Sequence, residues 1–126
     1  MKAREVMTRN VATVREDASI YEAMSILISE GVTGLPVVSR DGSLIGIVTE
    51  KDMLTLLNNP GIDHVTAGHL MTKKLICFDE GDDLTDINTC LKENNFRRVP
   101  ILSHGKLVGI ISRTDVMKAI LRGRCK

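Results

Sequence analysis

Two short motifs place a hydroxyl side chain three residues before an aspartate, and both follow a run of apolar residues. In the first motif Thr49 precedes Asp52, and in the second Ser112 precedes Asp115. This spacing is typical of a capping box, in which the two side chains complete the first turn of a helix. Backbone N–H groups at the positive end of a helix can also receive an anion. The motifs therefore predict two helix starts and leave open whether either one also binds a ligand.

The residues around the two motifs match each other, which indicates an internal duplication. Each motif follows a glycine and two β-branched residues, a pattern that favours a buried strand. Further matches join Met7-Thr8 to Met71-Thr72, Pro36-Val37-Val38 to Pro100-Ile101-Leu102, and Leu44-Ile45-Gly46 to Leu107-Val108-Gly109. The offset is 64 residues before the Asp41-Gly42 turn and 63 after it. We therefore assign residues 1–62 to a first repeat and 63–126 to a second.

Each repeat is predicted to hold a helical lead-in, a strand, a helix, a hairpin of two strands and a last helix. The first repeat has its lead-in at 3–8, a strand at 11–14 and a helix from Asp17 or Ser19 to Glu30. Two strands at 35–39 and 44–48 form its hairpin, and a last helix starts at Thr49 and is stopped by Asn59-Pro60-Gly61. The second has its lead-in at 66–71, a strand at 75–78, a helix at 83–93, strands at 99–102 and 107–111, and a helix that Gly123 closes.

The predicted fold class is α/β (α+β), with two β-α-β-β-α repeats. A unit of some 50 residues with so small a sheet would be only marginally stable alone, because little of its surface can be buried. We therefore expect the repeats to pack sheet to sheet about a pseudo-two-fold axis, with two equivalent clefts between them.

Composition argues against several classes of function. The formal net charge of +1 and an aromatic content of 2% give no footprint for nucleic acid, and no apolar run approaches the roughly 20 residues that span a membrane. No signal-like apolar core follows the N-terminus. The three cysteines show no paired spacing, so we expect a cytoplasmic protein with Cys77 and Cys90 in the core and Cys125 in a frayed tail.

Four segments together resemble a known family. They are Val32-Thr33-Gly34-Leu35-Pro36-Val37-Val38 with Gly46-Ile47-Val48-Thr49-x-x-Asp52, and Phe96-Arg97-Arg98-Val99-Pro100-Ile101 with Gly109-Ile110-Ile111-Ser112-x-x-Asp115. The pattern resembles paired cystathionine-β-synthase (CBS) domains, the Bateman module, over residues 5–121. The resemblance implies a regulatory module without catalysis that binds AMP, ADP, ATP or an S-adenosylmethionine-like compound, with no cofactor required.

The resemblance also implies which residues bind, with each cleft drawing on both repeats. One cleft would hold Thr49, Asp52, Leu75, Ile76, Arg97 and Arg98, and the other Ser112, Asp115, Asn10, Val11, Ala12, Thr33 and Gly34. A carboxylate suits a ribose diol, and guanidinium groups suit phosphate. Arg97 and Arg98 could instead be a solvated pair, and Asp52 and Asp115 could be caps only. Lys51, Arg113 and His104 are expected to be surface residues.

Three functions compete on this evidence. The favoured one is a sensor whose adenylate occupancy is read by an unidentified effector protein, and the alternative is a structural or partner-binding adaptor with a vestigial cleft. Catalysis is disfavoured because His64, His69 and His104 pair with no nucleophile in sequence, and no metal-ligand spacing occurs. Surplus apolar residues on the helices after Thr49 and Ser112 predict a homodimer.

Overall fold

The computed structural model describes residues 1–59 and 61–124, which fall into two compact units. One comprises Ala12–Leu75, and we call it the first-repeat unit. The other comprises Met1–Val11 with Ile76–Lys126, and we call it the second-repeat unit.

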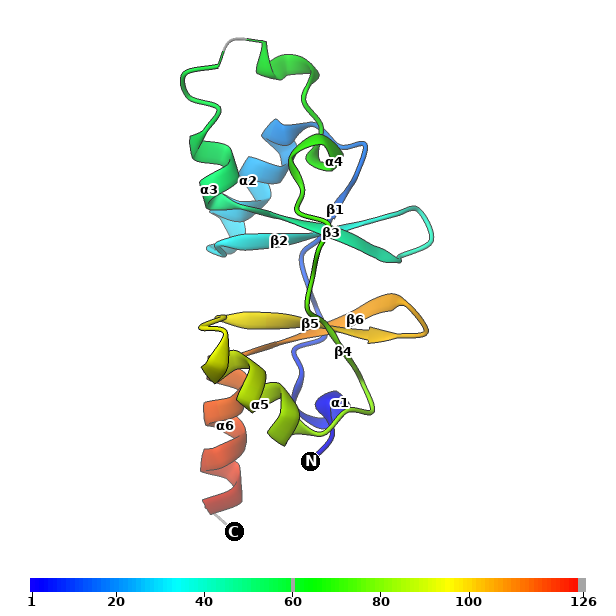
Figure 1. Ribbon diagram of the computed structural model, residues 1–126, viewed down its shortest axis with the longest axis vertical. Coiled ribbons are helices and arrows are strands. Elements are labelled where there is room, and N and C mark those ends of the chain that lie inside the picture. Colours follow the sequence, from blue (N-terminus) through cyan, green and yellow to red (C-terminus); the bar gives the residue numbers. More distant parts are fainter. Residues whose placement is uncertain (60, 125–126) are drawn as a thin grey trace. The chain divides into compact units, whose positions relative to one another are not determined.

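Both units contain a three-stranded sheet of the same topology (Figure 1). In the first-repeat unit, β1 (Val14–Arg15) pairs parallel to β2 (Gly34–Val38), which pairs antiparallel to β3 (Leu44–Thr49). In the second-repeat unit, β4 (Phe78–Asp79), β5 (Arg98–Ser103) and β6 (Lys106–Ser112) repeat this order. The register shifts at equivalent places, after Val37 and after Ile101. The mixed α/β class and the duplication are confirmed.

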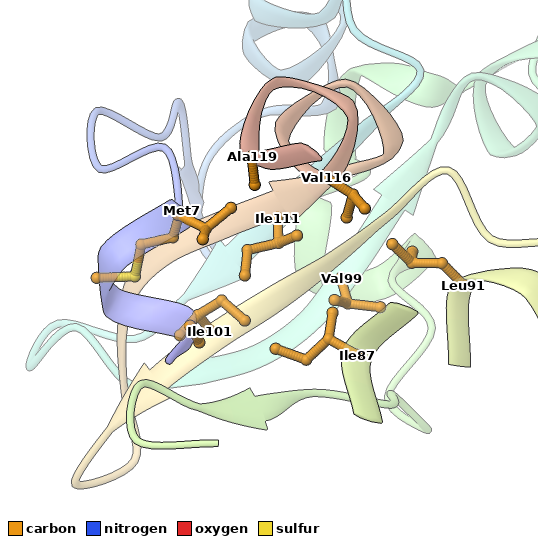
Figure 2. Packing of buried hydrophobic residues seen from close by; sticks show 10 residues of the cluster. Met7, Ile87, Leu91, Val99, Ile101, Ile111, Val116 and Ala119 are labelled. Carbon is orange, nitrogen blue, oxygen red and sulfur yellow. The ribbon is translucent and has the colours of Figure 1, made fainter. Parts of the chain in front are cut away.

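The helices of each unit pack on its own sheet. The first-repeat unit contains α2 (Ile20–Glu30), α3 (Glu50–Leu54), the short 3-10 helix η1 (Ile62–His64) and α4 (Ala67–Leu70). The second-repeat unit contains α1 (Ala3–Val6), α5 (Leu84–Glu93) and α6 (Arg113–Arg124), which contact one another and the sheet. Figure 2 shows the resulting core, in which Ile87 and Leu91 of α5 and Val116 and Ala119 of α6 meet residues of β5 and β6. The core of the first-repeat unit is equally aliphatic, with Ile20, Leu35, Val37 and Val48 fully buried.

Each lead-in segment docks on the sheet of the other repeat. The backbone of Thr8 exchanges hydrogen bonds of 2.8 and 2.9 Å with Ile110 on β6, and the backbone of Thr72 exchanges bonds of 2.8 and 3.0 Å with Ile47 on β3. The preceding methionines cover glycines on those strands, because a Cβ added to Gly109 or Gly46 would lie 2.6 Å or 2.5 Å from the sulfur of Met7 or Met71. The compact units therefore exchange their lead-ins, while the repeat boundaries at 62 and 63 remain a prediction about the duplication.

Local chemistry explains the two ends of α2 and the turn of the second hairpin. Ser19 rather than Asp17 caps α2, because its hydroxyl accepts the backbone N–H of Tyr21 at 3.1 Å, and Gly31 ends the helix at φ 65°. His104 and Gly105 both have positive φ, which a two-residue hairpin of type I′ requires.

Four predicted features are wrong. The first strands start three residues later than expected, at Val14 and Phe78, because only there does the chain reach a partner on β2 or β5. Cys77 is consequently exposed rather than in the core, whereas Cys90 is half-buried and packs against the core. Helix α3 ends at Leu54, where the hydroxyl of Thr55 donates to the Asp52 carbonyl at 2.7 Å. Gly123 lies inside α6 and does not close it, and the predicted tail at Cys125 lies outside the described residues.

Candidate functional site

In the first-repeat unit, the predicted capping box forms where β3 runs into α3. Oδ2 of Asp52 accepts the backbone N–H of Thr49 at 2.8 Å and its hydroxyl at 3.1 Å. Gly34 pairs with Thr49 across the sheet, and the N–H of Glu50 donates to the carbonyl of Thr33 at 2.9 Å. Asp52 is half-buried, and within the described part of the chain its other oxygen, Oδ1, has no hydrogen-bond partner. One carboxylate oxygen is therefore structural, and the other is open to a ligand.

In the equivalent site of the second-repeat unit, both carboxylate oxygens already accept hydrogen bonds from the protein. Oδ2 of Asp115 accepts the backbone N–H of Ser112 at 2.8 Å and its hydroxyl at 2.9 Å. The second oxygen, Oδ1, accepts the hydroxyl of Thr8 at 3.0 Å. Asp115 is only 8% exposed. Both oxygens of this carboxylate are thus engaged inside the unit, and a ribose would have to displace Thr8 or share its acceptor.

The two arginines stand beside the start of α6. Arg98 pairs with Ser112 in the sheet, and the carbonyl of Arg97 accepts the backbone N–H of Arg113 at 3.1 Å. Arg97 is exposed and Arg98 half-buried. The Nε atom of Arg98 is buried and lacks a hydrogen-bond partner among the described residues. A buried donor without an acceptor costs about 1–3 kcal/mol, and an anionic ligand oxygen would recover this energy only once the side chain had moved to expose the atom.

Some of the predicted site residues lie together within one unit and come from one repeat. Thr33 and Gly34 adjoin Thr49 and Asp52, and the arginine pair adjoins Ser112 and Asp115. The remaining predicted residues lie outside helices and strands. Ala12 and Leu75 belong to the first-repeat unit, and Asn10, Val11 and Ile76 belong to the second-repeat unit. The combination of residues from both repeats into one site remains a prediction.

Sequence reasoning missed two polar contributors. Thr8 stands out in the sequence only as part of a duplicated dipeptide, and its bond to Asp115 joins residues 107 positions apart, which no local pattern predicts. Arg113 is exposed, as expected, and it also donates from Nε to the carbonyl of Phe96 and from Nη2 to Oδ1 of Asn95, both at 2.9 Å. The sequence signal for this role was the position of Arg113, directly after the predicted junction of a strand and a helix.

Other chemistry is sparse in the described residues. Among them, no group of three or more His, Cys, Asp or Glu side chains could hold a metal ion, and none of their helices has the length and apolar character to cross a membrane. A hydrogen bond to Asp63 (3.0 Å) raises the pKa of Tyr21, but this pair lies on α2 and η1 rather than at either capping box.

Comparison with known proteins gives one family match for each of the two repeats. The family model described as "CBS domain" matches residues 3–59 and 67–122. An uncharacterized protein of Methanocaldococcus jannaschii is 35% identical over 93% of this chain, and a homoserine O-acetyltransferase of Methanococcus vannielii is 29% identical over 91%. The chain spans 42% and 24% of the lengths of these two relatives.

Two solved structures carry ligands named with them. Arabidopsis thaliana CBSX2 in complex with AMP has a TM-score of 0.85 and 29% identity, with 98% of each chain covered. The CBS domain pair of protein MJ0100, in complex with 5′-methylthioadenosine and S-adenosyl-L-methionine, has a TM-score of 0.78 and 26% identity, with 100% of this chain and 98% of that chain covered.

Proposed function

This chain belongs to the CBS domain family, and from that premise we propose that it is a regulatory module that binds an adenosine nucleotide. The structural relatives in complex with AMP, and with 5′-methylthioadenosine and S-adenosyl-L-methionine, support an adenosine compound as the ligand class. The preference for a phosphorylated ligand rests on one observation, the buried Nε of Arg98 without an acceptor. A phosphate oxygen satisfies such a donor, whereas adenosine and 5′-methylthioadenosine carry no anionic oxygen.

The sugar would be held by Asp52 rather than Asp115. Oδ1 of Asp52 is open, while Oδ1 of Asp115 already accepts from Thr8. Following the family resemblance, we propose that Asp52 and Thr49 act with Arg97 and Arg98 on one ligand. The site of Ser112 and Asp115, with Thr33 and Gly34, would then bind more weakly.

Thermal unfolding with added ligand tests this function directly. A ligand that binds only the native state raises the midpoint, and saturation at 100 times Kd stabilises by about 2.7 kcal/mol. We expect AMP to raise the midpoint more than adenosine or S-adenosylmethionine, with GMP as the matched control. No shift with any adenosine compound at millimolar concentration would leave the adaptor with a vestigial site as the better function.

That alternative has an observation of its own in its favour. In both motifs the carboxylate accepts the backbone N–H of the hydroxyl residue, as a capping box requires, and both oxygens of Asp115 already accept hydrogen bonds. A module whose carboxylates serve only the fold would bind partners without sensing nucleotides. We expect no catalysis from either version, and we propose a cytoplasmic location for both.

Partner control would use the apolar surface of the second-repeat unit. A groove of about 490 Å³ lies between α5 and α6, with Leu91 and Val116 among its lining residues. Met117, Ile120 and Leu121 are 56%, 57% and 63% exposed on α6. Exposed apolar clusters of this kind mark association surfaces. We propose that a second copy of the chain covers this surface, and that an effector protein reads the resulting assembly.

Sedimentation tests the homodimer. Wild-type protein at tens of micromolar should exceed the monomer mass of 13.9 kDa, and Ile120→Glu should return it to monomer. Lys118→Glu, on the same helix, serves as the charge control. A wild-type monomer at these concentrations would contradict the proposal.

A further inference from the structure

We propose that Arg113 is a positioning residue that holds Arg97 and Arg98 in place for a phosphate. The inference rests on the proposed function, because it concerns how the same site is prepared for its ligand. All residues that carry it belong to the second-repeat unit.

Arg113 ties down three consecutive residues that lead into β5. Its side chain donates from Nη2 to Oδ1 of Asn95 and from Nε to the carbonyl of Phe96, each at 2.9 Å. Its backbone N–H donates to the carbonyl of Arg97 at 3.1 Å. The next residue, Arg98, is held by its pairing with Ser112. We call this set of contacts the Arg113 clamp.

The clamp acts on the turn between α5 and β5. Helix α5 ends at Glu93, and Asn95 adopts φ 55°, a left-handed conformation that is uncommon for a residue other than glycine. The ring of Phe96 packs against the core, whereas Asn95 and Arg97 are exposed. Arg113 therefore fixes the backbone between an anchored ring and the strand.

The first repeat lacks this device. Its equivalent turn has Gly31 in the place of Asn95 and Glu50 in the place of Arg113. The backbone bond is kept, since Glu50 donates to the carbonyl of Thr33 at 2.9 Å. A carboxylate cannot donate to a carbonyl, so the side-chain clamp is specific to the turn that carries two arginines.

Preorganisation is the expected benefit. A side chain that must be ordered on binding reduces affinity by the free energy of that ordering, and a turn already fixed avoids this cost. Arg98 keeps its Nε buried without a partner, on a backbone held by its pairing with Ser112. Adenosine makes no phosphate contact, so the clamp should affect AMP and leave adenosine unchanged.

The test compares AMP and adenosine affinities by calorimetry for two variants of residue 113. Arg113→Met removes both side-chain bonds and the charge, and Arg113→Lys keeps the charge but cannot present two donors in a fork. We expect both variants to weaken AMP binding by roughly threefold to tenfold, as the loss of about 1 kcal/mol of ordering predicts, with adenosine affinity unchanged. Lys118→Met, which removes an exposed cation from the same helix, should change neither.

Asn95→Gly tests the clamp by removing the acceptor of one of the two side-chain hydrogen bonds of Arg113. Glycine tolerates the positive φ, so the substitution removes the acceptor without straining the turn. Its effect on AMP should be in the same direction, and the double variant with Arg113→Met should weaken AMP no further than Arg113→Met alone. Hydrogen exchange at the amides of residues 96–98 should be faster in Arg113→Met than in Lys118→Met, with or without ligand.

These measurements separate the possible failures. Wild-type affinity for AMP in Arg113→Lys but not in Arg113→Met would mean that Arg113 acts by charge alone, which overturns the positioning role. Unchanged exchange at residues 96–98 would overturn the clamp itself. If wild-type protein binds no adenosine compound, the proposed function fails, and the ligand role of the clamp fails with it; faster exchange in Arg113→Met would then show a purely structural clamp.

Discussion

At the scale of single residues, the two aspartates share a motif but not an environment. Calorimetry with AMP on Asp52→Ala and Asp115→Ala should show the difference. Asp52→Ala should abolish the tighter, phosphate-dependent binding event, whereas Asp115→Ala should leave it largely intact. Each charge-assisted bond to phosphate or ribose contributes about 1.5–3 kcal/mol, or one to two decades of affinity.

Arg98→Ala is the matched variant for the phosphate. It should bring the AMP affinity close to that of adenosine, and the remaining binding should depend less on salt. If Asp115→Ala removes the phosphate-dependent event instead, the assignment of the sites is reversed. If Arg98→Ala leaves the ratio of AMP to adenosine affinity unchanged, the arginines are only solvated.

Thiol labelling gives a second test at this scale. In a Cys125→Ser background, Cys77 should react rapidly with an aromatic disulfide reagent because it is exposed before β4. Cys90 should react more slowly, because it packs against the core from α5 and lies 3.5 Å from Nδ2 of Asn94. Equal rates in folded protein, with Cys77→Ser and Cys90→Ser as single-site controls, would contradict this placement.

At the scale of elements, the glycines on β3 and β6 control the docking of the lead-ins. Gly109→Ala should destabilise the fold by about 1–3 kcal/mol, because the new Cβ would meet the sulfur of Met7 at 2.6 Å and the carbonyl of Thr8 at 2.9 Å. Gly46→Ala should cost less, since all three of its nearest contacts belong to the side chain of Met71.

Urea unfolding measures both changes against a third glycine. Gly123→Ala meets nothing within 4 Å inside α6, so it should be neutral or stabilise by up to about 1 kcal/mol. Destabilisation by Gly123→Ala equal to that by Gly109→Ala would mean that close packing is not the cause.

The elements also show where sequence reasoning succeeds. Periodicity, caps and turn residues predicted α2, α5 and both hairpins, because these depend on neighbours in the chain. The strand starts at Val14 and Phe78 depend on which residues meet β2 and β5, and apolar residues precede both positions. The capping boxes at Thr49 and Ser112 were predictable from spacing. The bonds of Thr8 and Arg113 were not, since they join segments that no local rule connects.

At the scale of the whole molecule, the exchange of lead-ins makes each unit depend on both halves of the sequence. A chain divided between residues 62 and 63 should give two peptides that lack cooperative unfolding when alone, because each is without the segment that covers its Gly46 or Gly109. Mixing the peptides should restore a cooperative transition, followed by circular dichroism at equal concentrations. A cooperative transition in either peptide alone would show that the exchanged segment is dispensable.

The same exchange bears on how such a chain can arise. A single ancestral repeat would carry a lead-in for which its own sheet is not the docking site, so two copies would have had to trade these segments to complete their folds. Joining two such copies end to end turns an encounter between molecules, which depends on concentration, into a permanent arrangement within one polypeptide. Once joined, the copies are free to diverge. The second repeat has two arginines and the Arg113 clamp at this turn, whereas the first repeat has glycine and glutamate at the positions of Asn95 and Arg113, and this difference records the divergence.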